Sequence, residues 1–170
     1  MGRSFVLVAS ESFREALREL GLTRRTSELG DPKELGRRAA LMAAAEAAWK
    51  KHLGPLLEAK QVQELLGVGT RQAVSDLRSR GRLLGLTRQD GRVVYPAFQF
   101  GPGGRPFPEL PQILELLGER ATLDPWTQAS WFVSPQALLE GTTPAAWLRR
   151  KREPERVVRA ARRTAARLAG

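Results

Sequence analysis

The chain has 170 residues, of which 42% are hydrophobic, and its formal net charge is +10. This length suits one domain or two small ones with a hydrophobic core. The chain has no cysteine for disulfides or thiolate metal ligands, and its single histidine, His52, cannot hold a metal alone. No apolar run approaches the roughly 20 residues that cross a bilayer. We expect a cytoplasmic protein without a cofactor, a metal or a membrane contact.

Most of the positive charge lies at the C-terminal end. Residues 149–170 contain nine basic residues against Glu153 and Glu155, a net of +7 within the total of +10, so the rest of the chain carries only +3. A basic excess is the electrostatic footprint of a nucleic-acid-binding protein. The basic tail could contact DNA or a partner protein, and both readings stay open.

Two helices are predicted in the first part of the chain. Ser12-Phe13-Arg14-Glu15 fits a capping box and predicts a short helix that Gly21 ends. A polar loop over 23–30 follows. Asp31-Pro32, a cap followed by proline, then opens an alanine-rich helix over 35–51. This second helix could pack against another helix, in this chain or in a second copy. The residues that would line the contact are Ala39, Met42, Ala43, Ala47 and Trp49.

Residues 61–80 have the outline of two helices joined by a tight turn. Gly67-Val68-Gly69 interrupts the helical pattern, because glycine adopts the left-handed conformations that end helices. Thr70 can cap the second helix. The turn is one residue longer than in familiar helix-turn-helix units, and Gln63 stands where a small residue is usual. The apolar side chains expected between the helices are Val62, Leu65, Leu66, Ala73, Val74 and Leu77.

A β-hairpin is predicted directly after these helices. Asp90-Gly91 lies between the apolar runs 83–86 and 92–95, and Asp-Gly between such runs is a strong turn signal. Pro96 would end this two-stranded ribbon because it cannot donate to a ladder. Helix, turn, helix and ribbon follow one another in the order of a winged helix-turn-helix, which we expect over 54–100.

The polar face of the second helix points to double-stranded DNA as the partner. Arginine suits guanine, glutamine suits adenine and serine suits either, and basic residues on a wing suit the phosphate backbone. A helical hairpin that merely packs is the alternative. The candidate DNA-binding residues are Thr70, Arg71, Gln72, Ser75, Arg78, Arg80, Arg82, Arg88, Gln89 and Arg92.

A small helical region is expected over 101–170. It begins with a Gly/Pro-rich stretch that lacks the Lys-Ser/Thr of a phosphate-binding loop. A short helix is expected over 112–118, and later helices would start at Asp124-Pro125, Thr143-Pro144 and Glu153-Pro154. No nucleophile motif, paired carboxylates or metal cluster supports catalysis, so we expect no enzyme. Core roles are expected for Trp126, Trp131 and Trp147. The last helix carries an apolar stripe that must pack on something, which favours a protein partner for the tail; its residues are Val157, Ala161, Ala165 and Leu168.

Three stretches together resemble bacterial antitoxins of the Xre/ParS/MbcA type. They are Glu64-Leu65-Leu66-Gly67-Val68 with 71–75, then Tyr95-Pro96-Ala97-Phe98-Gln99-Phe100, and then 138–148, which contains Gly141-Thr142-Thr143-Pro144. The resemblance runs from Trp49 to the C-terminus. It implies an operator-binding helix-turn-helix and a C-terminal region that inhibits a protein toxin, which in comparable systems has a RES-type fold and consumes NAD. The toxin-binding residues it implies are Gly141, Thr142, Thr143, Pro144, Trp147, Arg149, Arg156, Arg159 and Arg163.

The fold expected from the sequence is mainly α with a small β-ribbon: a helical N-terminal region over 1–53, the winged helix-turn-helix over 54–100, and the helical region over 101–170. The leading functional hypothesis is a homodimeric antitoxin and transcriptional autorepressor of a type II toxin–antitoxin pair. The alternatives are a stand-alone winged-helix regulator or nucleoid-type DNA-binding protein, whose tail adds a second DNA contact, and an adaptor protein.

Overall fold

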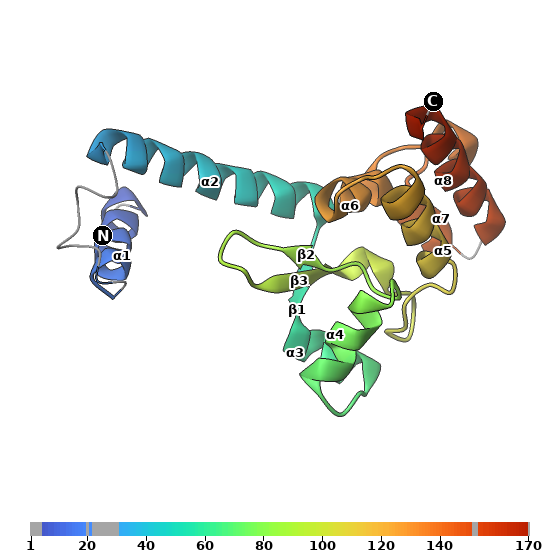
Figure 1. Cartoon of the computed structure of the whole chain (residues 1–170), viewed down its shortest axis with the longest axis horizontal. Helices are drawn as coiled ribbons and strands as arrows, with labels where there is room; N and C mark the ends of the chain where they lie inside the picture. Colours follow the sequence, from blue (N-terminus) through green and yellow to red (C-terminus); the bar gives the residue numbers. More distant parts are fainter. Residues whose placement is uncertain (1–4, 20, 22–30, 151–152, 170) are drawn as a thin grey trace. The chain divides into compact units, whose positions relative to one another are not determined.

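A computed structural model describes residues 5–19, 21, 31–150 and 153–169 (Figure 1). The fold is mainly helical with one three-stranded antiparallel sheet, which agrees with the expected fold class. The chain divides into two compact units, Met1–Ala47 and Ala48–Gly170. No helix among the described residues is long and apolar enough to cross a membrane.

The first unit contains helix α1 (Phe5–Glu19) and most of helix α2 (Pro32–Leu53). The expected start of α1 at Ser12 is wrong, because the helix begins at Phe5 and Ser12 lies inside it. Its end is as predicted, since Gly21 has φ +68° and its N–H donates to a helix carbonyl. The Asp31 cap of α2 is also confirmed by a 3.0 Å hydrogen bond from the Lys33 N–H to Asp31 Oδ1. The predicted loop over 23–30 and the side chains of Met42 and Ala43 lie outside the described residues.

The second unit is built around the sheet, whose strand order is β1-β3-β2. Strands β2 (Leu86–Thr87) and β3 (Val93–Pro96) form the predicted hairpin. Strand β1 (Leu56–Glu58) was not predicted, and it pairs antiparallel with β3, with Leu57 opposite Tyr95. The ribbon of two strands expected from the sequence is therefore an incomplete description of a three-stranded sheet.

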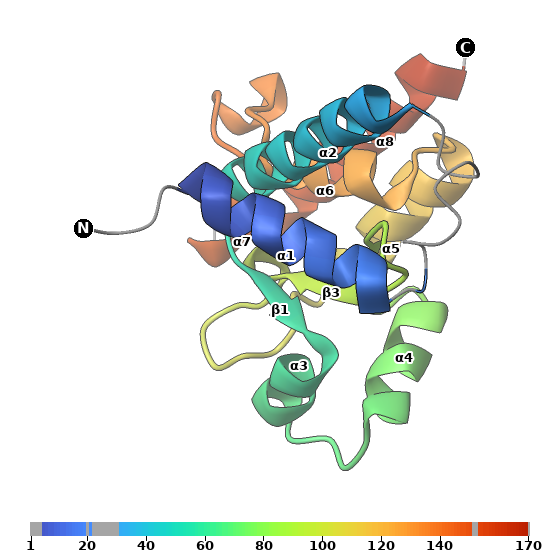
Figure 2. The same cartoon turned by 90° about the vertical axis from the view of Figure 1, so that its left-hand side faces the viewer.

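Helices cover both faces of this sheet (Figures 1 and 2). Helices α3 (Ala59–Leu66) and α4 (Arg71–Ser79) pack on one face. A larger helical layer covers the other face. Its elements are α5 (Leu110–Glu115), the π-helical η4 (Leu116–Arg120), α6 (Pro125–Val133), α7 (Pro144–Arg149) and α8 (Pro154–Ala169). The 3-10 turn η3 (Ala97–Gln99) precedes α5, and the 3-10 turn η5 (Ala137–Leu139) lies between α6 and α7.

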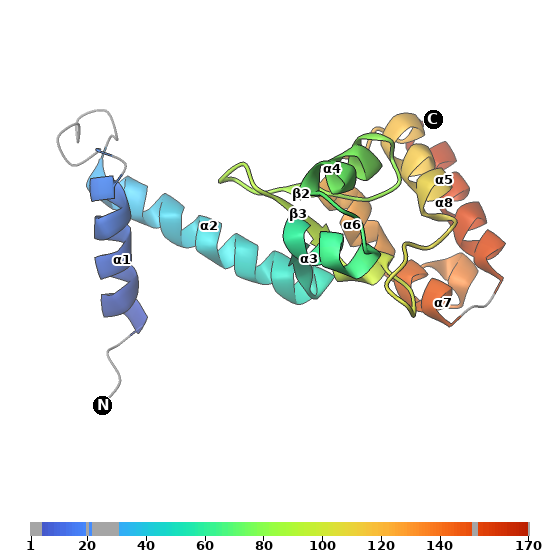
Figure 3. The ribbon, with the colours of Figure 1, turned by 90° about the horizontal axis from the view of Figure 1, so that it is seen from below.

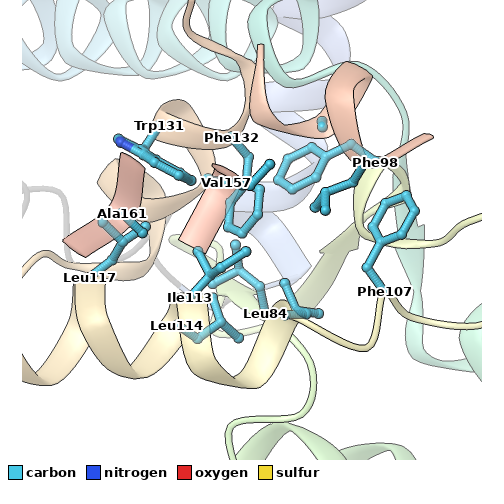
Figure 4. Packing of buried hydrophobic residues seen from close by; sticks show 14 of the residues in the cluster. Leu84, Phe98, Phe107, Ile113, Leu114, Leu117, Trp131, Phe132, Val157 and Ala161 are labelled. Carbon is cyan, nitrogen blue, oxygen red and sulfur yellow. The ribbon is translucent and has the colours of Figure 1, made fainter. Parts of the chain in front are cut away.

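Successive residues of β3 point to opposite faces and so belong to different hydrophobic clusters. Tyr95 lies in the helix-turn-helix cluster, with Val62, Val74, Leu83 and Phe100. Val94 lies in the C-terminal cluster, a larger group to which Phe98, Phe107, Ile113, Leu117, Trp131, Phe132 and Val157 also belong (Figure 4). Residues from both sides of position 100 thus share one core. The expected boundary at residue 100 does not separate two compact units.

The C-terminal cluster explains the tryptophans and the last helix. Trp131 and Trp147 are buried in it, and Trp126 is partly buried against it, which confirms their predicted core role. The predicted caps Asp124 and Thr143 also start α6 and α7. On α8, the stripe of Val157, Ala161 and Ala165 is buried, whereas Leu168 is 51% exposed, so the stripe is one residue shorter than predicted.

Candidate nucleic-acid interface

Local geometry makes α3 and α4 a helix-turn-helix. Helix α3 ends at Gly67, whose φ of +66° is the left-handed conformation that closes a helix. Thr70 then caps α4, because its Oγ1 accepts a 3.1 Å hydrogen bond from the Ala73 N–H. Val62 and Val74 are fully buried between the two helices. The cap and the turn were both predicted from the sequence.

Two features of this element differ from expectation. Leu65, expected in the core, is 42% exposed and lies instead against the backbone of Gly104 in the Gly/Pro-rich loop. Gln63 has a role that the sequence did not reveal, because its Nε2 donates a 3.2 Å hydrogen bond to the carbonyl of Gly69. This bond holds the longer turn. A small residue at position 63 would leave the turn without that bond.

The outward face of α4 is polar and open to solvent. Arg71, Gln72 and Ser75 are exposed, while Val74 on the opposite face is buried. The Gln72 side chain is oriented along the helix by a 2.9 Å hydrogen bond from its Nε2 to Asp76 Oδ1. Arg80 and Arg82, which follow the helix, are also exposed. The structure thus brings the predicted α4 residues to one accessible surface, with one exception.

The exception is Arg78, which lies against the sheet. Its side chain crosses Gly85 so closely that a Cβ there would lie 2.7 Å from Arg78 Cδ. Its Nη2 is 3.5 Å from Thr87 Oγ1. Burial raises the pKa of the Tyr95 hydroxyl, and the positive charge of Arg78 lowers it in part. Arg78 is thus half-buried and lies against the sheet rather than on the open face of α4, and its DNA contact stays a prediction.

The hairpin between β2 and β3 projects from the sheet as a wing (Figure 3). A 2.8 Å hydrogen bond from the Arg88 N–H to the Arg92 carbonyl closes it, and Gly91 supplies the φ of +80° that the turn requires. Asp90 accepts a 3.0 Å hydrogen bond from the Arg92 N–H and lies 3.7 Å from the Arg92 guanidinium. Gln89 and Arg92 are exposed at the tip, as predicted.

Two further side chains fix the base of the wing. Gln99, only 1% exposed, accepts from the Leu84 N–H at 2.8 Å and donates to the carbonyls of Leu84 and Pro96 at 3.0 Å each. The Trp126 indole N–H donates at 3.1 Å to the carbonyl of Thr87, the last residue of β2. Sequence reasoning missed both roles. A glutamine between two phenylalanines in an apolar run was the available signal for Gln99.

The residues expected to bind a toxin are split between the core and the surface. Pro144 and Trp147 are buried, and Thr143 caps α7 through a 3.3 Å hydrogen bond from the Ala146 N–H. Arg156 pairs with Glu140 at 3.1 Å and lies 5.0 Å over the Trp147 ring. Those remaining at the surface are Gly141, Arg149, Arg159 and Arg163, with Thr142 half-buried.

Comparison with known proteins identifies a similar fold. No family model and no curated protein matches the sequence. Among solved structures, the chain is similar to the NMR structure of Rv2175c, with a TM-score of 0.56 and 25% sequence identity over 65% of this chain and 81% of that one.

No group of three or more histidine, aspartate or glutamate side chains that could hold a metal occurs among the described residues.

Proposed function

We propose that the chain binds double-stranded DNA through α4 and the β2–β3 wing, as a transcriptional regulator. The observation that carries the proposal is the exposed polar face of α4, formed by Arg71, Gln72 and Ser75 beside an exposed, basic wing. The major groove of B-DNA admits an α-helix, and these side chains match the hydrogen-bonding edges of its bases.

The position of these residues along α4 supports base contact. Arg71 and Gln72 are the first two residues of the helix. In helix-turn-helix proteins the N-terminal residues of the recognition helix contact base edges. Gln89 and Arg92 are exposed on the wing and would contact the phosphate backbone, which positions a protein without reading sequence. We further propose a homodimer on a palindromic operator, because one recognition helix reads only a short half-site.

Selection of bound sites from random duplexes, followed by titration of variants, tests the proposal. Arg71→Ala should weaken binding to the selected duplex by about 1–3 kcal/mol more than binding to a shuffled one. Arg92→Ala should weaken binding to both duplexes alike, because it removes a phosphate contact. Gln72→Ala should act as Arg71→Ala does, whereas Gln112→Ala, its control at an exposed glutamine of α5, should weaken binding to neither duplex. Failure to enrich any site, or equal losses on both duplexes for Arg71→Ala, contradicts base reading.

Neutralisation of a protein toxin remains a separate prediction that rests on the sequence resemblance. The apolar face of α8 had favoured it, because such a face must pack on something. That face is already covered by the chain's own core, so it offers no site for a toxin. A toxin would have to bind the exposed Arg149, Arg159 and Arg163 instead. A toxic reading frame next to this gene, silenced by co-expression of the chain, is the result that would support this role.

A further inference from the structure

Helix α8 has one buried face and one charged face. Its buried residues pack on α5, η4, η5 and α7, so the helix is held firmly against the C-terminal cluster (Figure 4). The buried side chains are Val157, Val158, Ala160, Ala161 and Ala165. Because the core fixes the rotation of the helix, the opposite face is presented to solvent in a constant orientation.

The charged face is a row of four exposed arginines: Arg159, Arg162, Arg163 and Arg167. With 3.6 residues per turn they share one side of the helix, and at 1.5 Å per residue the row is about 12 Å long. No acidic residue follows Glu155 in α8. Within the part of the chain that the structure describes, none of the four has an ion-pair partner. Arg156 differs from them, because Glu140 and Trp147 occupy its guanidinium.

A row of this kind fits a phosphate backbone better than it fits other partners. A solvated helix face usually mixes both signs of charge. A membrane-surface helix needs a free apolar face, and that of α8 is buried. Guanidinium groups bind phosphate oxygens well, and duplex DNA offers a negative charge about every 1.7 Å along its axis.

The row lies on the other side of the sheet from the recognition helix. Val74 of α4 belongs to the helix-turn-helix cluster, whereas Val157 and Ala161 of α8 belong to the C-terminal cluster on the opposite face. Figures 1 and 2 show α4 and α8 at different sides of this unit. A duplex seated on α4 and the wing is therefore separated from the row by the sheet and its helices.

We propose that the arginine row of α8 binds the phosphate backbone of a second DNA duplex. The inference rests on the proposed DNA binding by α4, which supplies the first duplex. One chain then connects two DNA segments. The connection through α8 is independent of base sequence, because contacts between arginine and phosphate carry no sequence information.

Salt titration of duplex binding tests the row itself. Arg159→Gln with Arg163→Gln removes two charges spaced four residues apart on an exposed helix face. Arg14→Gln with Arg18→Gln removes two charges at the same spacing on exposed positions of α1 and is the matched control. With α4 already saturated by the enriched duplex, the α8 pair should lower the log–log salt slope for uptake of a further duplex by about 1.8, at about 0.9 for each lost phosphate contact, whereas the control pair should not change it. Equal slopes in all three proteins overturn the proposal, and that is also the result expected if the row binds a protein.

Capture of one duplex by another tests the bridge. A biotin-labelled duplex on beads is loaded with protein, and the recovery of a fluorescent duplex of the same sequence is measured. The wild type and the α1 pair should recover it, while the α8 pair should not. Recovery by the α8 pair would mean that a dimer of recognition helices forms the bridge. No recovery by the wild type would mean that the row contacts the same duplex. Either result overturns the proposal.

Arg71→Ala separates this proposal from the proposed DNA binding by α4. If Arg71→Ala leaves the preference for the enriched site intact, base reading by α4 fails, whatever the α8 pair does.

Discussion

Gln99 shows how one buried amide can organise the base of the wing. Its three hydrogen bonds join the end of β3 to the segment that leads into β2, because both the N–H and the carbonyl of Leu84 bond to it. No buried side-chain nitrogen or oxygen among the described residues lacks a hydrogen-bond partner. In such surroundings a polar group that loses its partner has no water to replace it.

Replacing Gln99 by leucine should therefore destabilise the protein strongly. The substitution keeps the side chain near its original size but leaves the Leu84 N–H and carbonyl unpaired in the core. We expect a loss of about 2–4 kcal/mol in the free energy of unfolding, since each buried unsatisfied group costs about 1–3 kcal/mol. Urea denaturation measures it. Gln136→Leu is the matched control, because that half-buried amide makes only a 3.3 Å bond to the Ser134 carbonyl. A similar loss in both variants would contradict the role of Gln99.

At the residue scale, part of the candidate site was predictable. The helical spacing of Arg71, Gln72 and Ser75, set against Val74, was enough to place them on the outward face. The same spacing also placed Arg78 outward, and this was wrong. The difference arises from Gly85, which lies outside α4. Because Gly85 has no side chain, it leaves the space that the Arg78 side chain fills. Periodicity describes one helix, whereas the position of a long side chain also depends on its neighbours.

At the scale of the element, capping residues were the most dependable signal. Asp31, Thr70, Asp124 and Thr143 each accept hydrogen bonds from the first turn of the helix they were expected to start. Strand β1 could not be predicted, because three residues are too few to show alternation and the strand exists only by pairing with β3. The start of α1 was missed because serine and glutamate also occur inside helices.

Asp124 allows the contribution of one cap to be measured. Its carboxylate accepts hydrogen bonds from the Thr127 hydroxyl and from the N–H groups of Trp126 and Thr127. The Thr127 side chain is the main reason why the pKa of Asp124 lies below its ordinary value, with backbone hydrogen bonds adding to it. We expect Asp124→Ala to cost about 1 kcal/mol at neutral pH.

This contribution should depend on pH in a defined direction. A carboxyl whose pKa is lower in the folded state stabilises the fold above its unfolded pKa of about 3.9, and this stability is lost as the pH falls through the folded value. The difference between wild type and Asp124→Ala, followed by thermal melting, should therefore shrink below about pH 4. Asp124→Asn, which caps without a titratable group, should show no such change against Asp124→Ala. A constant gap between the wild type and Asp124→Ala at all pH values would contradict the cap.

At the scale of the whole molecule, Ala48–Gly170 forms one compact unit because its core draws on residues far apart in the sequence. Leu84 and Val94 come from the predicted DNA-binding segment, whereas Val157 and Ala161 come from the last helix. The sequence pattern revealed the apolar stripe of α8 but could not reveal what covers it. That stripe had suggested an external partner, and the partner is the chain itself.

Removal of residues 154–170 should therefore unfold the C-terminal cluster. The deletion exposes the surface of α5 and η4 that α8 covers, so we expect a large fall in melting temperature and a loss of cooperativity in circular dichroism. Removal of residues 1–30 is the control and should leave the main transition unchanged, because these residues belong to the other unit. An unchanged melt after removal of 154–170 would contradict the packing of α8. A truncated tail is consequently a poor test of what the tail binds, and point substitutions of its exposed arginines are preferable.

The hydrogen bond between Trp126 and Thr87 has an optical consequence. The indole emission of a tryptophan depends on the polarity and hydrogen bonding of its surroundings, and this indole is bonded to the last residue of β2 while its ring lies 5.4 Å from that of Trp49. The two rings are close enough for their excited states to interact. The protein therefore carries a natural fluorophore at the base of its wing, and a displacement of that base should shift the emission wavelength of Trp126 without any attached dye.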